Sequence, residues 1–180
     1  MLVKKLEEAG YKWALLGTSL SRNRPPEEMA IVCENLSNKD GGHNKFLEFM
    51  VVWIDIDAPR YWWQQMSTYR IGSSWLSEST MYTIMKNQLE RFDFENDDVD
   101  ETILGKLNEF ILDKLFSKVK DNLPEGFLQR RIMVTNYKSL RNMINQRQLH
   151  KLPQWRFFCE EILKQLEHPE FIVKGDIKDA

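Results

Sequence analysis

The chain has 180 residues, of which 42% are apolar and 29% charged, and its formal net charge at pH 7 is −2. This length and apolar content predict one folded domain over residues 1–180 and exclude a largely disordered chain. The net charge argues against bulk binding of nucleic acid, although a local basic patch is compatible with it. No apolar run is long enough to span a membrane, and the charged start MLVKKLEEAG lacks a signal-peptide core, so we expect a cytoplasmic protein.

Two cysteines and a cluster of tryptophans stand out in the composition. Cys33 and Cys159 lie far apart and neither belongs to a metal-ligand motif, so we predict two reduced, buried thiols and no metal site. Trp53, Trp62 and Trp63 fall within a short stretch. Large amphipathic rings occur in cores, subunit contacts and base-stacking sites, and the enrichment of Trp at interfaces favours a core or subunit contact here.

Hydrophobic periodicity and capping residues predict the secondary structure. Residues 11–20 show no clear period, and the acidic stretch 93–100 is typical of solvated surface. In chain order the predicted elements are helices over 2–9 and 27–38, a strand over 46–57, a helix over 60–69, a loop over 71–82, helices over 81–92 and 101–120, a strand over 131–136, a helix over 137–149, and a last helix from Pro153 to His168.

The strand over 46–57 and the helix over 101–120 have the clearest patterns. In the strand, Val52, Ile54 and Ile56 occupy one face. In the helix, apolar residues recur along one stripe, which contains Ile103, Leu104, Leu107, Phe110, Ile111 and Leu115. Several helices and few short strands predict an α+β fold, with helices around a small, mostly antiparallel sheet.

One block of the sequence resembles a known enzyme family. This block contains Gly42-His43, Glu48, a strand that ends at Ala58-Pro59, and a helix that carries Gln65 and then Thr68-Tyr69-Arg70. Order and spacing are similar to those of the flavin-dependent thymidylate synthases, whose helix carries a Gln and then an Arg-His-Arg triplet. The segment that begins at Thr68, TYRIGSSWLSESTMY, resembles the corresponding sequence of small phage-encoded homologues.

A second block resembles the same family and follows in the same order. Asn142 and Arg147 match an Asn that faces the flavin and an Arg that holds the nucleotide, and Gln154-Trp155 comes after them. Two blocks in order are a more specific signal than either block alone. The resemblance implies a fold like that of the thymidylate synthase complementing proteins.

The resemblance implies roles for six residues and leaves the catalytic residues unknown. It places His43, Arg70 and Asn142 at the cofactor, and Gln65, Ser79 and Arg147 at the substrate. The implied ligands are FAD, a nucleotide such as dUMP, methylenetetrahydrofolate and a nicotinamide reductant such as NADPH. Because the family builds its pocket between subunits, a homo-oligomer, either dimer or tetramer, is expected.

Two departures from the family pattern bear on flavin binding and catalysis. Thr68 and Tyr69 stand where two members of the phosphate-gripping triplet are expected, which predicts weak or absent FAD binding. The Arg expected after Ser79, a contact for the substrate phosphate, is replaced by Thr80 or Met81. The family's full enzymes are also longer than this chain. These departures count against thymidylate synthesis.

Some of these positions have a second interpretation. Arg147 lies four residues after Met143 and seven after Leu140, so it extends an apolar helical stripe. A charged group there either reaches water from the edge of the core or is paired in a pocket, and the pocket agrees with the family position. Asn142 and Arg70 are compatible with ligand contact and with a solvated helix surface.

Three functions are compatible with the sequence. The first is a flavin-dependent thymidylate synthase that methylates dUMP, which would need NADPH and methylenetetrahydrofolate. The second, which the altered motifs favour, is a nucleotide-binding homologue with reduced or lost catalysis. The third is a phage-encoded interaction or anti-defence protein that binds a host protein or a nucleotide signal without chemistry.

Overall fold

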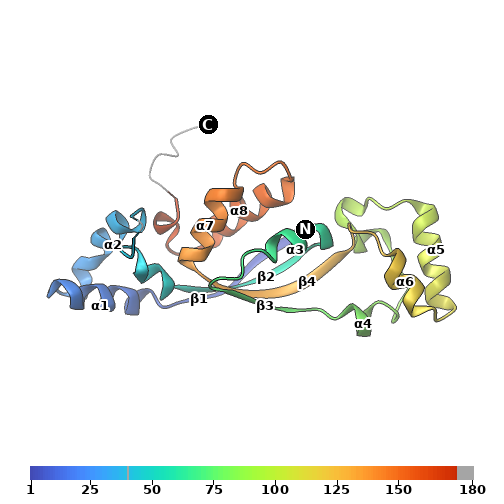
Figure 1. Cartoon of the computed structure of the whole chain (residues 1–180), viewed down its shortest axis with the longest axis horizontal. Helices are drawn as coiled ribbons and strands as arrows, with labels where there is room; N and C mark the ends of the chain where they lie inside the picture. Colours follow the sequence, from blue (N-terminus) through green and yellow to red (C-terminus); the bar gives the residue numbers. More distant parts are fainter. Residues whose placement is uncertain (40, 174–180) are drawn as a thin grey trace. The chain divides into compact units, whose positions relative to one another are not determined.

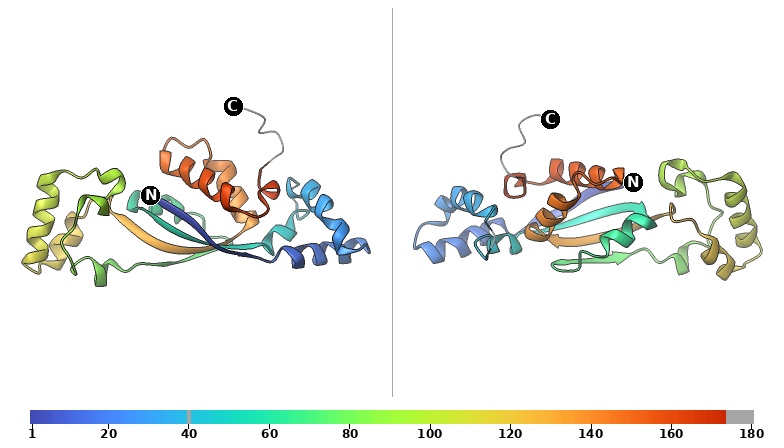
Figure 2. Two further views of the ribbon diagram at one scale, coloured as in Figure 1. Left: turned by 180° about the vertical axis from the view of Figure 1, so that it is seen from behind. Right: turned by 45° about the horizontal axis from the view of Figure 1, so that its top comes forward.

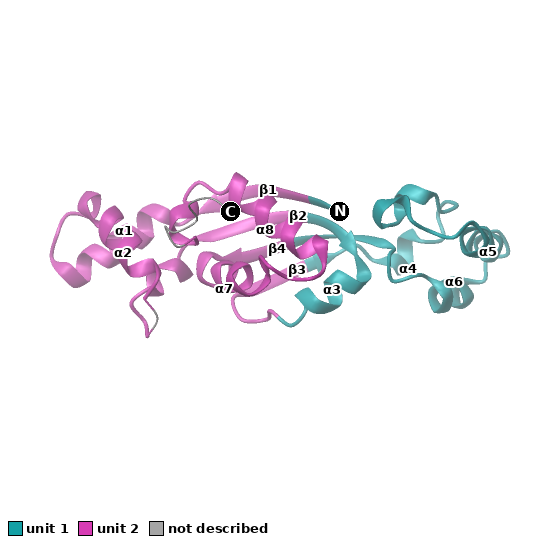
Figure 3. Cartoon of the chain, turned by 90° about the horizontal axis from the view of Figure 1, so that it is seen from above, with its two compact units in different colours: residues 1–2, 56–68, 76–132 teal, residues 3–55, 69–75, 133–180 magenta. Residues whose placement is uncertain are grey.

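The computed structural model describes residues 1–39 and 41–173. They divide into two compact units, coloured in Figure 3: unit 1 contains residues 1–2, 56–68 and 76–132, and unit 2 contains residues 3–55, 69–75 and those from 133 on. The described residues form eight α-helices, several 3-10 turns and a four-stranded antiparallel sheet (Figure 1), which confirms the predicted α+β class.

The sheet has the strand order β1-β2-β4-β3. The strand bounds are β1 Leu2–Ala9, β2 Val51–Pro59, β3 Ser73–Ser77 and β4 Leu128–Asn136. Each strand contributes residues to both units; β2, for example, changes unit between Asp55 and Ile56. The alternation predicted for β2 is confirmed, because Val52, Ile54 and Ile56 are fully buried.

Unit 2 contains two pairs of packed helices. α1 (Tyr11–Arg22) packs against α2 (Met29–Ser37), and α7 (Tyr137–Arg147) packs against α8 (Pro153–Gln165). Figures 1 and 2 show α7 and α8 on the same side of the strand segments of this unit. The predicted helices over 27–38, over 137–149 and after Pro153 are therefore confirmed, with small differences at their ends.

Unit 1 contains α3 (Arg60–Met66), α4 (Thr80–Thr83), α5 (Glu101–Leu112) and α6 (Phe116–Asn122). The last two pack on each other. Their apolar faces belong to a core cluster made of Ile84, Leu89, Phe94, Val99, Leu104, Leu107, Ile111, Val119, Leu123 and Phe127. The apolar stripe predicted for residues 101–120 is therefore confirmed for Leu104, Leu107, Phe110 and Ile111, whereas Ile103 and Leu115 are exposed.

The helix predicted over residues 2–9 is wrong, because these residues form β1, a strand at the edge of the sheet. The segment is rich in Leu, Lys, Glu and Ala, which favour a helix in isolation. Pairing with β2 decides its conformation instead, which is an interaction between distant parts of the chain that local propensity does not contain.

The other differences between the predicted and the observed secondary structure are helix breaks and a short strand. The helix predicted over 101–120 is divided into α5 and α6, because Lys114 adopts a left-handed conformation with a φ of 58°. The helix predicted over 81–92 is wrong beyond Thr83, where α4 ends. The loop predicted over 71–82 contains β3, and the strand predicted from residue 46 begins at Val51, after the 3-10 turn Lys45–Glu48.

The clustered tryptophans belong mainly to the core of unit 1. Trp62 and Trp63 are at most 1% exposed, and their rings meet edge to face at 4.9 Å. The Trp63 Nε1 donates to the carbonyl of Gln129 at 2.7 Å, and the guanidinium of Arg131 lies 4.5 Å from the ring centroid of Trp63. The core interpretation is therefore confirmed for these two residues, and they offer no exposed surface to a second subunit.

Both cysteines are free and buried, as the sequence predicts. Burial raises the pKa of Cys33, and it raises the pKa of Cys159 to about 12, so both thiols are uncharged at neutral pH. Among the described residues, no group of three or more His, Cys, Asp and Glu side chains could hold a metal ion. None of the described helices has the length and apolar character needed to cross a membrane.

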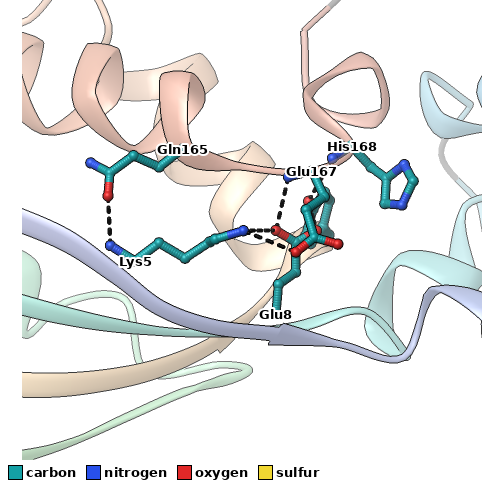
Figure 4. A network of polar contacts seen from close by, with 6 residues as sticks. Lys5, Glu8, Gln165, Glu167 and His168 are labelled. Carbon is teal, nitrogen blue, oxygen red and sulfur yellow. Dashed lines mark hydrogen bonds and ion pairs between the residues drawn. The ribbon is translucent and has the colours of Figure 1, made fainter.

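A polar network covers the outer edge of β1 (Figure 4). The backbone N–H of Lys5 donates to Oε1 of Gln165 at 2.8 Å, and Nε2 of Gln165 donates to the carbonyl of Val3 at 3.1 Å. The Lys5 ammonium lies 3.3 Å from the Glu8 carboxylate and 3.2 Å from that of Glu167. One amide thus occupies both hydrogen-bonding directions of an edge strand and replaces a neighbouring strand.

Replacing Gln165 with alanine should lower the free energy of unfolding by roughly 1.5–4.5 kcal/mol, because a typical hydrogen bond contributes about 0.5–1.5 kcal/mol and three are lost: the two to β1 and one from Nε2 to the carbonyl of Glu161 at 3.0 Å. Chemical denaturation measures this change. The matched control is Gln88→Ala, since Gln88 is exposed and lies in unit 1. A loss no larger than that of the control would show that water serves the edge of β1 equally well.

Candidate functional site

Arg147 is the last residue of α7, and aromatic residues surround its half-buried side chain. Its spacing from the buried Leu140 and Met143 turns it toward the core, as the helical stripe predicts. Nε of Arg147 donates to Oη of Tyr69 at 2.7 Å. The guanidinium carbon lies 5.5 Å from the ring centroid of Tyr69 and 5.0 Å from that of Trp155, which are cation–π distances.

The charge of Arg147 has no internal counter-ion within the described residues. No carboxylate there pairs with it, and its two Nη atoms donate no hydrogen bond to any described side chain or carbonyl. A hydroxyl and two ring faces orient the guanidinium but do not neutralise it. The planar pair of Nη donors therefore remains available to an anion.

A chain of hydrogen bonds continues from Tyr69 along the exposed face of α7. The Tyr69 hydroxyl donates to Oε1 of Gln146 at 2.9 Å, and Nε2 of Gln146 donates to Oδ1 of Asn142 at 3.0 Å. Asn142 and Gln146 are four residues apart and therefore neighbours on the helix surface. Tyr69 thus connects the predicted nucleotide residue, Arg147, to the predicted cofactor residue, Asn142.

The segment after Tyr69 is fixed to the start of α7. The Ser139 hydroxyl donates to the carbonyl of Ile71 at 2.8 Å, and the N–H of Asn136 donates to the carbonyl of Gly72 at 3.3 Å. Gly72 has a φ of 70°, and a Cβ there would lie 2.4 Å from Oγ of Ser139 and 2.6 Å from Nδ2 of Asn136. Only glycine permits this approach, which holds Tyr69 at a defined position beside the helix.

Basic groups gather at the turn between α7 and α8. Nη1 of Arg156 donates to the carbonyl of His150 at 2.8 Å, and Nδ1 of His150 accepts from the N–H of Leu152 at 3.1 Å. Partial burial and the positive charges of Arg147, Lys151 and Arg156 lower the pKa of His150. His150 is therefore neutral at pH 7, and three cations near it form a positive local potential that favours an anionic ligand.

The other residues that the resemblance singled out lie in different places. Arg70 is exposed and follows Tyr69 in the same unit, whereas Gln65 on α3 and Ser79 at the N-terminus of α4 belong to unit 1. Thr68 is exposed, and its hydroxyl donates to the carbonyl of Gln65 at 2.8 Å. Within one unit, the structure brings Asn142 and Arg147 together through Tyr69 and Gln146.

His43 is exposed and borders a separate cavity of about 490 Å³ in unit 2. The lining includes Trp13, Arg22, Lys45 and Phe49. No hydrogen bond, ion pair or ring contact of the described residues joins His43 to Arg147. The described residues therefore show no direct contact between this predicted cofactor residue and the Tyr69–Arg147 cluster.

Sequence reasoning missed two residues of the cluster. Gln146 was not singled out, although its position four residues after Asn142 and directly before Arg147 is visible in the sequence. The sequence indicates Trp155 only as part of a motif. Its position beside the guanidinium of Arg147 is a tertiary contact, which the sequence does not show. Tyr69 contacts both Trp155 and Arg147: its ring meets that of Trp155 at 5.8 Å, and its hydroxyl accepts from Arg147 and donates to Gln146.

Comparison with known families gives a match over most of the chain. Residues 11–169 match the family described as thymidylate synthase complementing protein. The matched range contains both blocks described above, including Tyr69, Asn142 and Arg147. No curated protein sequence matches the chain.

Solved structures with the same fold include a flavin-dependent thymidylate synthase ThyX from Helicobacter pylori, complexed with FAD and dUMP. The TM-score is 0.81 at 18% sequence identity, over 96% of this chain and 98% of that chain. A second ThyX structure from Helicobacter pylori with FAD and dUMP gives a TM-score of 0.76 at 17% identity, over 96% and 97% of the two chains. Because this chain spans nearly the whole length of those proteins, its length is no argument against the complete fold.

Proposed function

This chain belongs to the thymidylate synthase complementing protein family, and from that premise we propose that it binds a nucleotide such as dUMP at the cluster of Tyr69, Arg147 and Trp155. The observation that carries the proposal is the open guanidinium of Arg147, which is oriented by Tyr69 at 2.7 Å and has no internal counter-ion among the described residues. A planar donor pair suits a phosphate group, and the half-buried ring of Tyr69 suits a base or sugar, whereas the fully buried Trp155 supports both side chains from the core.

The charge of the surrounding turn supports the same ligand. Lys151 and Arg156 add positive charge near His150, and Arg156 is held in place by its bond to the carbonyl of that residue. A monophosphate carries up to two negative charges, so it would gain from several cations without needing a direct contact to each. Both Helicobacter pylori ThyX structures of this fold contain dUMP together with FAD, which makes dUMP the first nucleotide to test.

Calorimetric titration with dUMP and with deoxyuridine tests the proposal. We expect dUMP to bind at least tenfold more tightly, because one hydrogen bond between charged groups contributes about 1.5–3 kcal/mol and about 1.4 kcal/mol corresponds to tenfold in affinity. Equal affinities for the two compounds would argue against phosphate recognition by Arg147. Absence of binding by both would contradict nucleotide binding and favour the alternative of an interaction or anti-defence protein.

The residues at the triplet do not fit a flavin pyrophosphate. The Thr68 hydroxyl is engaged with the carbonyl of Gln65, and the Tyr69 hydroxyl is engaged with Arg147 and Gln146. Neither residue offers a cation, so Arg70 is the remaining member of the set. We therefore assign no hydride-transfer step to this chain, and the roles proposed for His43, Arg70 and Asn142 at a flavin depend on whether FAD binds at all.

The absorbance spectrum of the purified protein should contain no flavin band. Two lost charge-assisted contacts at roughly 1.5–3 kcal/mol each weaken FAD binding by about two to four decades. Titration with FAD, followed by flavin fluorescence, measures any residual affinity. Stoichiometric FAD that stays bound through purification would contradict this prediction and would revive the enzyme hypothesis, in which NADPH and methylenetetrahydrofolate are also substrates.

We further propose reduced or lost thymidylate synthesis, and a homo-oligomer, either a dimer or a tetramer. At the position of the missing phosphate-binding Arg, Thr80 is buried and Met81 is exposed, so neither can replace a guanidinium. Exposed apolar side chains, including Ile71 and Leu149, support subunit contact in place of the buried tryptophans. Light scattering tests the assembly. Three further statements also stay predictions. They are that Ser79 and Gln65 contact the substrate, that residues 1–180 form a single domain, and that the protein is cytoplasmic.

A further inference from the structure

We infer that Arg141 is the centre of an oxyanion site, for a phosphate or a carboxylate group, where α7 meets the end of α2 in unit 2. Arg141 is 8% exposed, and Nη2 of its guanidinium donates to Oδ1 of Asn38, the C-cap residue of α2, at 2.9 Å. The site is separate from the Tyr69–Arg147 cluster and does not depend on the proposed function. Arg141 and Arg147 are six residues apart, a rotation of about 600° around the helix axis, so their side chains leave α7 on different faces.

The buried charge of Arg141 has no full counter-charge within residues 1–39 and 41–173. No carboxylate of these residues forms an ion pair with it, and its Nε is buried without a hydrogen-bond acceptor among them. α7 packs on the 3-10 turn Lys45–Glu48, and the Glu48 carboxylate already pairs with Lys138 at 2.5 Å. The C-terminus of α2 contributes about half a negative charge, so a substantial part of the guanidinium charge stays unbalanced.

An oxyanion satisfies both the buried donor and the charge. A water molecule accepts from Nε but leaves a positive charge in a place of low dielectric constant, which is unfavourable. An oxyanion accepts from Nε and neutralises the guanidinium. Asn38 extends the donor set: because arginine has no acceptor atom, its bond fixes Oδ1 of Asn38 toward Nη2. Asn38 is exposed, so its Nδ2 group, with two N–H donors, is accessible to an anion that reaches Arg141.

Sodium phosphate and sodium acetate test the site, each compared with sodium chloride at equal ionic strength. An anion that binds only the folded protein stabilises it in proportion to the logarithm of its concentration. We expect one of the two to raise the melting temperature of the wild-type protein by roughly 5–10 °C above that in chloride, at a hundredfold excess over its dissociation constant. The more effective anion identifies the ligand group as a phosphate or a carboxylate. No rise with either anion would overturn the inference.

Arg141→Met removes the charge and keeps a side chain that packs. We expect its melting temperature in chloride to equal or exceed that of the wild-type protein, because exchange of a buried uncompensated charge for an apolar group is neutral or stabilising. The rise caused by the active anion should disappear. An equal rise in Arg141→Met would indicate a general salt effect or an adventitious ion only, and would overturn the inference. Arg24→Met, at an exposed arginine of the same unit, is the matched control and should keep the full rise.

Asn38→Asp places an internal counter-ion beside the same guanidinium. Its carboxylate takes the position at which Oδ1 already accepts from Nη2 of Arg141. We expect this variant to melt at a higher temperature than the wild-type protein in chloride, and to bind the active anion at least tenfold more weakly. An acidic residue near the C-terminus of a helix is otherwise destabilising. The matched control, Asn35→Asp at another exposed position of α2, should therefore melt at a slightly lower temperature and keep its response to the anion.

Two further outcomes would also contradict the site at Arg141. Lower melting temperatures in chloride for both Arg141→Met and Asn38→Asp would show that the protein itself balances the charge of Arg141. Arg147→Ala should keep the response to the anion, because Arg147 lies on another face of α7. A response that is lost in Arg147→Ala and kept in Arg141→Met would place the anion at the Tyr69–Arg147 cluster, which would overturn this inference and leave the proposed function standing.

Discussion

The dUMP affinity of the Arg147→Ala variant should be about a hundredfold lower than that of the wild-type protein, with the fold intact. Two charge-assisted contacts from the open Nη atoms, at about 1.5 kcal/mol each, correspond to about two decades of affinity. Arg147→Lys keeps the charge but loses the planar pair of donors, so we expect an intermediate loss. Calorimetric titration of the three proteins measures these differences.

The stability of the same variants reports on the partner of Arg147. Breaking a buried ion pair costs about 3–5 kcal/mol, whereas the loss of one hydrogen bond to Tyr69 at about 0.5–1.5 kcal/mol is offset by removal of an uncompensated charge. We therefore expect the free energy of unfolding of Arg147→Ala, without ligand, to change by less than about 2 kcal/mol. Arg24→Ala is the matched control, because Arg24 is exposed and its guanidinium pairs with Glu28 at the surface.

A result with the opposite pattern would change the assignment of Arg147. A wild-type melting temperature that no nucleotide raises, together with a large loss of stability in Arg147→Ala, would make this arginine structural. Its charge would then be balanced within the protein. That outcome would favour the protein-interaction alternative over nucleotide binding.

Trp155→Ala should have the largest effect on stability, roughly 3–5 kcal/mol, which is typical of a large aromatic residue removed from a core. Trp155 is fully buried, and its ring meets those of Tyr69 at 5.8 Å and Phe158 at 6.0 Å. Equilibrium denaturation in urea measures the change. Trp155→Phe keeps an aromatic ring beside Arg147 and should lose distinctly less stability than the alanine variant.

The control for this prediction is another tryptophan in the same unit. Trp13 on α1 is 56% exposed, so Trp13→Ala should change the free energy of unfolding by no more than about 1 kcal/mol, since exposed positions leave no cavity. Equal losses in the two variants would show that Trp155 is not part of a packed core. A stable Trp155→Ala protein that still binds dUMP with wild-type affinity would exclude Trp155 as a support of the site.

Several features of this protein are determined locally and were predicted from the sequence. The alternation of Val52, Ile54 and Ile56 predicts β2 because one face of a strand must be buried. The helical spacing of Leu140, Met143 and Arg147 places that arginine against the core. Two ordered motifs within the range matched by the family predicted both the family and its α+β fold.

Other features depend on contacts between residues that are distant in the sequence. Residues 2–9 favour a helix locally and become a strand only because β2 and Gln165 satisfy their backbone. Tyr69 and Gln146 are 77 positions apart, and their hydrogen bond requires the segment around Gly72 to lie against α7. Periodicity reports which face of an element is buried, but it does not report which element covers that face. The tertiary structure alone therefore decided that a tyrosine orients Arg147 and that Gln146 connects it to Asn142.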